Sequence, residues 1–353
     1  MKINLTNNKK VFNYCKPYII AELGSNHNGD MKLAKKLISE AKDAGVDCVK
    51  FQSWSSKTLF AKEKYDANYF IADDYRNRND FTLEEIVKEY AISEQELIDM
   101  KAFADELGVD CTSTPFSEKE VDFLVDKLNT PFIKVASMDL NNYPFLEYIA
   151  KKGKPIVIST GLSNLNEIDR AVKTIEDAGN TQIVILHCVA TYPTPDIDVN
   201  LNNLKTLMSI YPNYPVGFSD HTMGSSIPLA SVALGACLLE KHFTLDQNME
   251  GWDHKISATK EEMKDIVINS KRISVALGLE RITVTESKEK VAEFRRSIVI
   301  INALKVGETI LNENITYKRP GTGITPGDVK HVLGRKVNQD LKADALLKWE
   351  YLN

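Results

Sequence analysis

The sequence lacks the usual marks of a secreted, membrane-spanning or nucleic-acid-binding protein. Its 353 residues contain five cysteines, an odd number, with no Cys-x-x-Cys pair, so neither a disulfide framework nor a zinc ribbon is expected. The most apolar long stretch, residues 227–239, is interrupted by Ser231 and Gly235 and is shorter than the ~18 residues of a membrane span. The net charge of −5 gives no sign of a polyanionic partner. We therefore expect no membrane and no nucleic-acid partner.

Two further absences bear on location and fold class. Residues 1–14 are polar and rich in Asn and Lys, without the apolar segment of a secretory signal peptide. The cysteines lie mostly within apolar runs, as the buried thiols of a reducing compartment do. We therefore expect a cytoplasmic protein. No Gly-x-Gly-x-x-Gly sequence follows the first predicted strand, which disfavours an open dinucleotide-binding sheet.

Short runs rich in Val and Ile alternate with amphipathic helical patterns from residue 18 onward, which is typical of a parallel sheet with crossover helices. The predicted strands are residues 18–22, 47–51, 109–112, 132–135, 155–159, 183–187, 215–219 and 237–241. The predicted helices are residues 31–44, 94–107, 118–128, 143–151, 164–178, 201–209, 227–234 and 259–277. Three of them begin with a capping box, at Ser93, Ser117 and Thr259. Eight strand–helix units in about 260 residues predict an α/β fold, a (β/α)8 TIM barrel over residues 1–280.

The pattern changes after Gly278. Residues 281–293 are charged and read as a linker. Residues 294–353 contain short β-type runs separated by turn signals, at 297–301, 309–310, 317–318, 332–333 and 346–347. They predict a small β-rich second domain.

Each predicted strand of the barrel delivers a polar or ionisable group to its carboxyl end, where the active sites of such barrels lie. Lys50 and Lys134 lie inside apolar runs, which is costly unless they face a ligand or a carboxylate. His221 and His242 end the last two strands and could hold a divalent metal, because neutral imidazole is an ordinary metal ligand. Glu22 and Glu240 are candidates beside them for acid/base groups or for residues that hold a water molecule.

The same edge contains a predicted anion site. Lysine supplies positive charge and hydroxyl groups supply donors, so two lysines with several Ser and Thr residues would bind a phosphate or a phosphorylated carboxylate. A long segment, residues 53–92, follows the second strand, and we expect it to cover the mouth of the barrel. For His27 and His254, the sequence leaves two roles open, a contact with substrate or a plain surface position. We expect His187 to be a hydrogen-bonded core residue and His331 to be a surface residue.

Several motifs resemble those of the sialic acid synthase (N-acetylneuraminate synthase) family, in the same order along the chain. They are residues 21–29, 49–52, 113–117, 159–161, 192–195, 219–222 and 240–244. Residues 319–324, Arg-Pro-Gly-Thr-Gly-Ile, resemble the signature of that family's antifreeze-like domain, a SAF domain of the β-clip type. The resemblance spans nearly the whole chain.

The resemblance implies a metal-dependent condensation of phosphoenolpyruvate with an N-acetylated hexosamine such as N-acetylmannosamine. Water enters, and a nine-carbon 2-keto-3-deoxy acid and phosphate leave. By this likeness His221 and His242 bind the metal, for which we expect Mn²⁺, with Mg²⁺ or Co²⁺ as alternatives. The residues that would hold phosphoenolpyruvate are Lys50, Lys134, Thr114, Ser159 and Ser219. Those that would line the sugar and metal are Glu22, Gln52, Tyr192 and Glu240. In a domain-swapped homodimer, Arg319 would reach the sugar bound by the partner's barrel.

Three departures from the family pattern concern the sugar. The usual Gly-Ser-Gly-Glu is Ala-Ser-Met-Asp here, which makes Ser137 and Asp139 substrate-binding candidates with a shorter carboxylate. The Asn usual just before the Tyr-Pro-Thr-Pro motif is missing from Val189-Ala190-Thr191, and Trp252 replaces a usual Pro. A di-N-acetylated dideoxy hexose, as used by legionaminic or pseudaminic acid synthases, is therefore an alternative acceptor.

Two other functions stay open from the residues alone. Lys50 or Lys134 could act as the nucleophile of a Schiff-base aldolase. A non-catalytic protein with a carbohydrate- or ice-binding terminal domain is the second alternative, although a pure binder has no need of ionisable groups at every strand end.

Overall fold

The computed structural model describes residues 2–6, 9–68 and 82–353. The chain divides into two compact units, Met1–Gly278 and Leu279–Asn353, and each is described by itself. Among the described residues, no helix combines the length and the apolar character needed to cross a bilayer.

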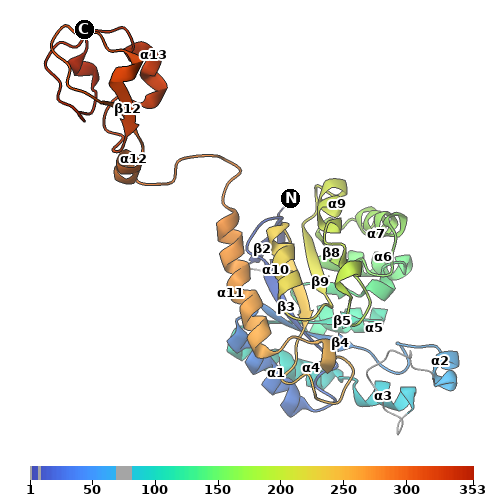
Figure 1. Ribbon diagram of the computed structural model, residues 1–353. Helices are drawn as coiled ribbons and strands as arrows, with labels where there is room; N and C mark the ends of the chain where they lie inside the picture. The colour runs from blue at the N-terminus through green and yellow to red at the C-terminus, as the bar shows by residue number, and fades with distance from the viewer. Residues whose placement is uncertain (1, 7–8, 69–81) are drawn as a thin grey trace. The chain divides into compact units, whose positions relative to one another are not determined.

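The first unit is a barrel of eight parallel strands (Figure 1). They are β3 (Tyr18–Gly24), β4 (Cys48–Ser53), β5 (Asp110–Pro115), β6 (Ile133–Val135), β7 (Ile156–Ser159), β8 (Ile183–Cys188), β9 (Val216–Asp220) and β10 (Leu238–His242). Their hydrogen-bonded order is β5-β4-β3-β10-β9-β8-β7-β6. The first and last strands of this order are β5 and β6. They are connected where the Thr112 hydroxyl donates to the carbonyl of Phe132, just before β6, at 3.1 Å. All eight predicted strands and the predicted fold class are confirmed.

Helices cover the outside of the sheet (Figure 1). They are α1 (Met31–Ala44), α4 (Glu94–Leu107), α5 (Glu118–Asp122), α6 (Tyr143–Lys151), α7 (Leu165–Asp177), α8 (Asp196–Val199), α9 (Asn203–Ile210), α10 (Ser226–Ala233) and α11 (Lys260–Leu277). The predicted helix at 118–128 ends as α5, and a π-helical turn continues it over Phe123–Lys127. The predicted capping boxes at Ser93 and Thr259 form.

The third predicted capping box is only half formed. Ser117 accepts from the Glu120 amide, but the reciprocal half of the capping box is not formed. One oxygen of the Glu120 carboxylate accepts from the Phe116 amide at 2.7 Å and the other from the Thr58 hydroxyl at 2.9 Å. The Glu120 carboxylate is therefore bonded both by a local amide and by a residue distant in the chain.

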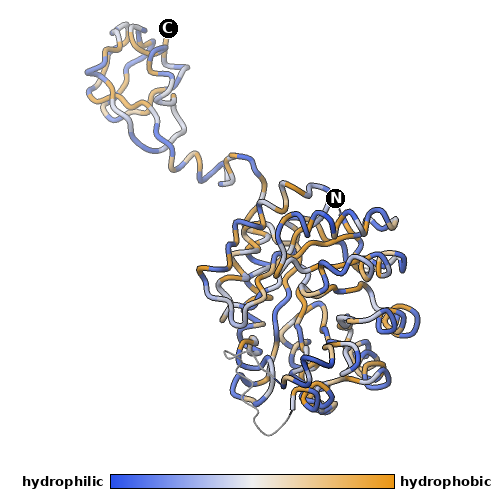
Figure 2. The backbone as a smooth tube through the Cα atoms, turned by 90° about the vertical axis from the view of Figure 1, so that its right-hand side faces the viewer, coloured by the Kyte–Doolittle hydropathy of each residue, from blue (hydrophilic) through white to orange (hydrophobic). Residues whose placement is uncertain are grey.

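The amino-terminal end of the barrel is apolar. A hairpin of β1 (Ile3–Thr6) and β2 (Lys9–Val11) belongs to one buried cluster with strand residues such as Ile20, Val157 and Leu186. The hydropathy along these strands can be followed in Figure 2. The five cysteines are free and buried, as predicted. Apolar side chains fill the amino-terminal end of the barrel, and the ionisable strand residues lie toward its carboxyl-terminal end.

The described parts of residues 53–92 contain α2 (Lys62–Ala67) and α3 (Leu83–Glu89). Their cluster joins Trp54, Leu83 and Tyr90 to Trp252 from the loop after β10, with the two indole centroids 5.7 Å apart. This packing places the segment beside a loop of the barrel mouth. Residues 69–81 of this segment, which include Tyr69, Phe70, Tyr75 and Asn79, lie outside the described residues.

The first helix of the second unit is α12 (Lys288–Phe294), which overlaps the end of the predicted linker. The antiparallel strands β11 (Ser297–Ile300) and β12 (Ile315–Lys318) follow it. Isolated bridges join Val299 to Leu346 and Thr309 to Lys336. The β-type run predicted at 332–333 is wrong, because Val332 ends α13 (Val329–Val332) with its side chain fully buried. A two-residue apolar run cannot distinguish a strand from a helical turn.

Candidate active site

Eight of the predicted site residues form one polar network at the carboxyl ends of the barrel strands. They are Glu22 on β3, Lys50 and Gln52 on β4, Thr114 on β5, Lys134 on β6, Ser159 on β7, Ser219 on β9 and Glu240 on β10. All are buried except Gln52, which is half-buried. Strand alternation explains the grouping, since every second side chain of a barrel strand points inward.

Lys50 lies at the centre of one half of this network. Its Nζ is 2.5 Å from Glu22 Oε2 and 3.7 Å from Glu240 Oε2, and it donates to Thr114 Oγ1 at 2.9 Å. Gln52 Nε2 donates to the other oxygen of Glu22 at 2.6 Å. Both oxygens of Glu22 are therefore engaged by groups from β4.

Lys134 and Glu240 make the other half. Lys134 Nζ is 3.5 Å from Glu240 Oε1 and donates to Ser159 Oγ at 2.7 Å. The Ser219 hydroxyl donates to Glu240 Oε1 at 3.0 Å. Glu240 thus lies between two buried ammonium groups, each of which also holds a hydroxyl.

The two carboxylates have opposite pKa shifts. Burial raises the pKa of Glu22 to about 7, against the opposing attraction of Lys50. Burial also acts to raise the pKa of Glu240, but Lys134 and Lys50 outweigh it and lower that pKa to about 2. Glu240 is therefore a fixed negative charge, while Glu22 exchanges a proton near neutral pH. Carboxylates separated in this way suit acid/base work.

The lysines also differ. Burial acts to lower the pKa of Lys50, but Glu22 and Glu240 raise it overall. Burial dominates at Lys134 and lowers its pKa.

His221 and His242 lie together beside this network, with ring centroids 5.5 Å apart. His221 Nδ1 is 2.8 Å from the carbonyl of Val189. Because a carbonyl only accepts, Nδ1 bears a proton, and in the neutral ring Nε2 keeps its lone pair. Burial acts to lower the pKa of His221, but Cys188 and the Val189 carbonyl raise it overall. His242 Nδ1 is buried with no hydrogen-bond partner among the described residues, and burial lowers its pKa to about 4. The Tyr192 ring lies 4.1 Å from that of His221.

The histidine pair fits a divalent metal with few protein ligands. Within the described residues, no group of three or more His, Cys, Asp and Glu side chains could hold an ion. The pair does provide one imidazole oriented by a carbonyl, as metal-bound histidines usually are, and one neutral imidazole with an unused buried nitrogen 3.7 Å from Asp253 Oδ2. His221 and His242 could hold such an ion only if substrate or water completed its coordination.

Three predicted site residues lie outside the network. Ser137 Oγ accepts from the Gly161 amide at 3.1 Å and donates to Cys188 Sγ at 3.5 Å. Asp139, on the same 3-10 turn, accepts from Asn142. Arg319 belongs to the second unit, where its exposed guanidinium lies 5.0 Å from the Phe294 ring.

The remaining histidines are largely structural. His27 Nδ1 accepts from the Gly29 amide, and His254 Nδ1 pairs with Thr244 Oγ1 at 2.7 Å. His187 is a buried core residue that bonds the carbonyl of Val199, as predicted. His331 is exposed, also as predicted.

Sequence reasoning missed three contributors to the site. Cys188 Sγ lies 3.9 Å from His221 Nδ1, although its apolar setting in sequence predicted a plain core thiol. Asp220 and Lys241 form a buried ion pair at 2.6 Å. Their adjacency to the two histidines was the available signal, since a charged neighbour in an apolar strand requires a partner.

The comparisons with known proteins decide the family. A model of the NeuB family matches residues 37–281, and a model of the SAF domain matches residues 295–353. The chain belongs to the NeuB family. It is an enzyme of the N-acetylneuraminate synthase type with a carboxyl-terminal SAF domain, as the resemblance of its motifs implied. This membership removes the non-catalytic alternative.

Named relatives cover most of the chain. An N,N'-diacetyllegionaminic acid synthase of Legionella pneumophila is 36% identical over 95% of this chain and 94% of its own. An N-acetylneuraminate-9-phosphate synthase of Drosophila melanogaster is 38% identical over 74% and 69%. The crystal structure of an N-acetylneuraminic acid synthetase from Leptospira borgpetersenii, in complex with citrate, superposes with a TM-score of 0.73 at 32% identity, over 82% of this chain and 94% of that one.

Proposed function

We propose that this NeuB-family enzyme condenses phosphoenolpyruvate with the open-chain form of an N-acetylated amino sugar in a metal-dependent reaction. The observation that best supports the proposal is Glu240 between Lys50 and Lys134, beside the pair His221 and His242. Two buried cations next to two metal-competent imidazoles suit a small, multiply charged anion and a carbonyl compound in one site.

The lysine half of the site would hold phosphoenolpyruvate. Its phosphate and carboxylate need cations and hydroxyl donors, which Lys50 with Thr114 and Lys134 with Ser159 offer as pairs. Glu240 keeps the two ammonium groups balanced while the site is empty of anion. Fixed charges of this kind stabilise a transition state without reorganisation.

In the proposed reaction, C3 of phosphoenolpyruvate attacks the aldehyde carbon of the sugar, and water captures the positive charge that develops at C2. The tetrahedral species then loses phosphate by C–O cleavage. A divalent cation held by His221 and His242, proposed to be Mn²⁺, would supply polarisation of the aldehyde. Glu22, with its pKa of about 7, would take the proton from the attacking water, and Gln52 would hold its carboxylate in place.

Two acceptors are in competition. An N-acetylated hexosamine such as N-acetylmannosamine is the first candidate. A di-N-acetylated dideoxy hexose is the second, favoured by the Asn missing from Val189-Ala190-Thr191 and the shorter carboxylate of Asp139 and by the relative named for N,N'-diacetyllegionaminic acid. Both departures concern the sugar and leave the chemistry of phosphoenolpyruvate unchanged.

The assembly is also part of the proposal. In a domain-swapped homodimer, the exposed Arg319 would contact the N-acyl group of the sugar in the partner's barrel. Phosphoenolpyruvate is a metabolite of the cytoplasm, where we propose that the enzyme works.

One assay tests the proposal directly. Phosphate release from phosphoenolpyruvate is measured with Mn²⁺ and a panel of mono- and di-N-acetylated hexoses, with and without EDTA. Release that requires both a sugar and a metal supports the condensation, and the preferred sugar identifies the acceptor. Absence of release with every sugar would overturn it.

A Schiff-base aldolase is the second candidate, because the lowered pKa of Lys134 makes its neutral, nucleophilic form more accessible. Borohydride reduction in the presence of a carbonyl substrate separates the two mechanisms. Trapping of a covalent adduct at Lys134, with activity insensitive to EDTA, favours the aldolase. An untrapped enzyme that EDTA inactivates favours the condensation.

A further inference from the structure

The residues that directly precede His221 and His242 in sequence form an ion pair on the outer face of the barrel sheet. Asp220 and Lys241 are register partners on β9 and β10. Strand alternation directs Ser219 and Glu240 into the barrel, where they bond each other, so Asp220 and Lys241 face the helical layer. Their strand neighbours Phe218 and Leu239, two residues back, belong to the core beneath those helices.

This outer contact is a three-point connection. Lys241 Nζ lies 2.6 Å from Asp220 Oδ2 and donates to the carbonyl of Thr222 at 2.5 Å. The Thr222 amide donates to Asp220 Oδ1 at 2.9 Å. Both charged residues are almost completely buried, at 1% and 3% exposure. These bonds therefore join Asp220 and Thr222, the residues on either side of His221, to each other and to Lys241, the residue that precedes His242.

Stability alone does not account for such a pair. A buried ion pair is often no better for folding than apolar residues of the same volume, since desolvation offsets the attraction. A hydrogen-bonded ion pair fixes the positions of two strands relative to each other, because it is directional. A hydrophobic contact between two strands does not. Here the positions that it fixes are those of two imidazoles whose rings lie 5.5 Å apart.

We propose that Asp220 and Lys241 are positioning residues that hold His221 and His242 at the separation a divalent cation requires. The inference rests on the proposed function in so far as the histidine pair binds the metal. Groups that orient metal ligands typically contribute about 10- to 100-fold in metal affinity, and we expect an effect of that size.

The test measures Mn²⁺ binding to the full-length protein by calorimetric titration, together with thermal unfolding in the absence of metal. Lys241→Met is expected to weaken Mn²⁺ binding by about 10- to 100-fold and, by leaving Asp220 unpaired, to lower the unfolding temperature. The double variant Asp220→Asn with Lys241→Met removes the unpaired charge. It should recover much of the thermal stability while its Mn²⁺ affinity stays low, which a purely structural role does not predict.

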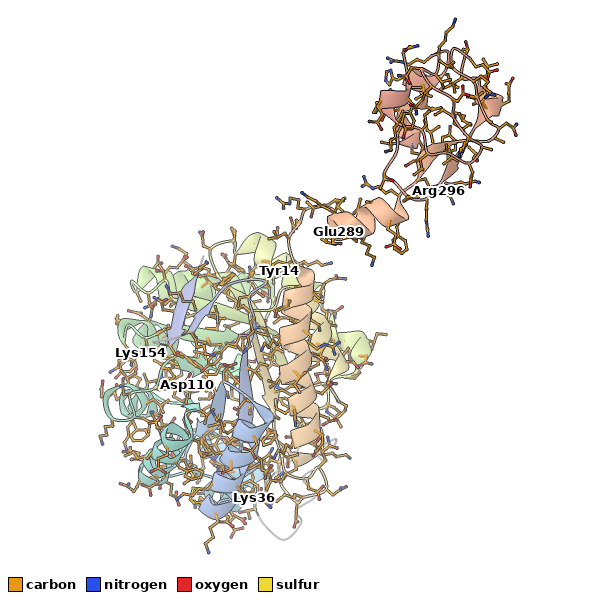
Figure 3. All side chains as sticks on the ribbon, turned by 90° about the vertical axis from the view of Figure 1, so that its left-hand side faces the viewer. Tyr14, Lys36, Asp110, Lys154, Glu289 and Arg296 are labelled. Atoms are coloured by element: carbon orange, nitrogen blue, oxygen red, sulfur yellow. The ribbon has the colours of Figure 1, made fainter. Side chains whose placement is uncertain are left out.

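Two controls make the result specific. Tyr18→Phe removes the 2.7 Å hydrogen bond to Asp110, which joins β3 to β5 at the opposite end of the barrel; Asp110 is labelled in Figure 3. Mn²⁺ affinity should not change. If Lys241→Met does not fold, Asp220→Asn alone, which keeps the shape and loses the charge, should still weaken Mn²⁺ binding.

The inference and the proposed function fail in different ways. If the wild-type protein binds no Mn²⁺, or His221→Gln binds it as tightly as wild type, the proposed metal site itself is wrong. If His221→Gln abolishes binding but the folded variants of Asp220 and Lys241 bind Mn²⁺ with wild-type affinity, only the positioning role is overturned.

Discussion

Lys134 Nζ lies 3.5 Å from Glu240 Oε1, and the two side chains face each other across the barrel from β6 and β10. These strands are not neighbours in the sheet, so the pair exists only because the sheet closes. Removal of either residue leaves the charge of the other buried with fewer opposite charges around it. The ammonium group of Lys134 is also proposed to bind phosphoenolpyruvate.

Lys134→Ala should cripple the use of phosphoenolpyruvate. Loss of one preorganised group that stabilises developing charge typically costs about 10²–10³-fold in rate, and we expect kcat/KM for phosphoenolpyruvate to fall by that factor. Initial rates at limiting phosphoenolpyruvate measure it. Lys173→Ala is the control, since Lys173 pairs with Asp177 on the surface of α7. An unchanged rate in Lys134→Ala would count against the proposed anion site.

Removal of metal should abolish phosphate release, and added Mn²⁺ should restore it. His221→Gln should resist this rescue, because it removes one of the two imidazoles and leaves too few protein ligands. His331→Gln is the matched control, since His331 is exposed in the second unit. Phosphate release after EDTA treatment and Mn²⁺ titration is the measurement. Equal rescue of the two variants would contradict a metal role for His221.

Acid should destabilise the protein through its buried histidines. Burial lowers the pKa of His27 and of His254 to about 4 from an ordinary value of 6.5. Between about pH 6.5 and pH 4 these two histidines are protonated in the unfolded chain but neutral in the folded protein. The free energy of unfolding therefore falls as pH decreases through this range. Each fully buried histidine could account for about 1–3 kcal/mol.

His254→Gln should flatten this pH dependence. Urea unfolding at about pH 7.5 and pH 5 gives the change in unfolding free energy for wild type and variant, and their difference isolates the histidine. The subtraction is needed because Glu22 acts in the opposite direction: its folded pKa, about 7, is above its ordinary 4.5, so its contribution improves as pH falls through that window. A variant with the wild-type slope would refute the assignment to His254.

Gly217→Ala should destabilise the barrel beneath the site. A Cβ at this position would lie 2.6 Å from the Leu238 carbonyl oxygen and 2.7 Å from Leu186 Cδ2, so β9 and β10 must separate. Overpacking of this kind costs about 1–3 kcal/mol. Thermal unfolding measures it against Gly327→Ala, where the nearest atom, a Thr325 hydroxyl oxygen at 3.2 Å, belongs to a side chain that can move. Equal stability of Gly217→Ala and wild type would show that the strands accommodate the methyl group.

The sequence by itself determined the barrel and most of its site. Alternating strand and helix patterns are local properties, and the position of a polar residue at a strand's carboxyl end follows from them. Lys50 and Lys134 could be recognised because a lysine within an apolar strand requires a partner. The same logic applies to Lys241, whose partner is Asp220 on the neighbouring strand.

Only the tertiary structure decided which partner each of these groups has. Glu22 and Glu240 look alike in sequence. Yet burial, only partly offset by Lys50, raises the pKa of Glu22 to about 7, whereas Lys134 and Lys50 outweigh burial and lower the pKa of Glu240 to about 2. Cys188 lies beside His221, and Thr58 donates to the Glu120 carboxylate, through contacts between residues that are distant in the chain. Electrostatics and hydrogen bonding act through space, so closure of the sheet decided what the order of residues left open.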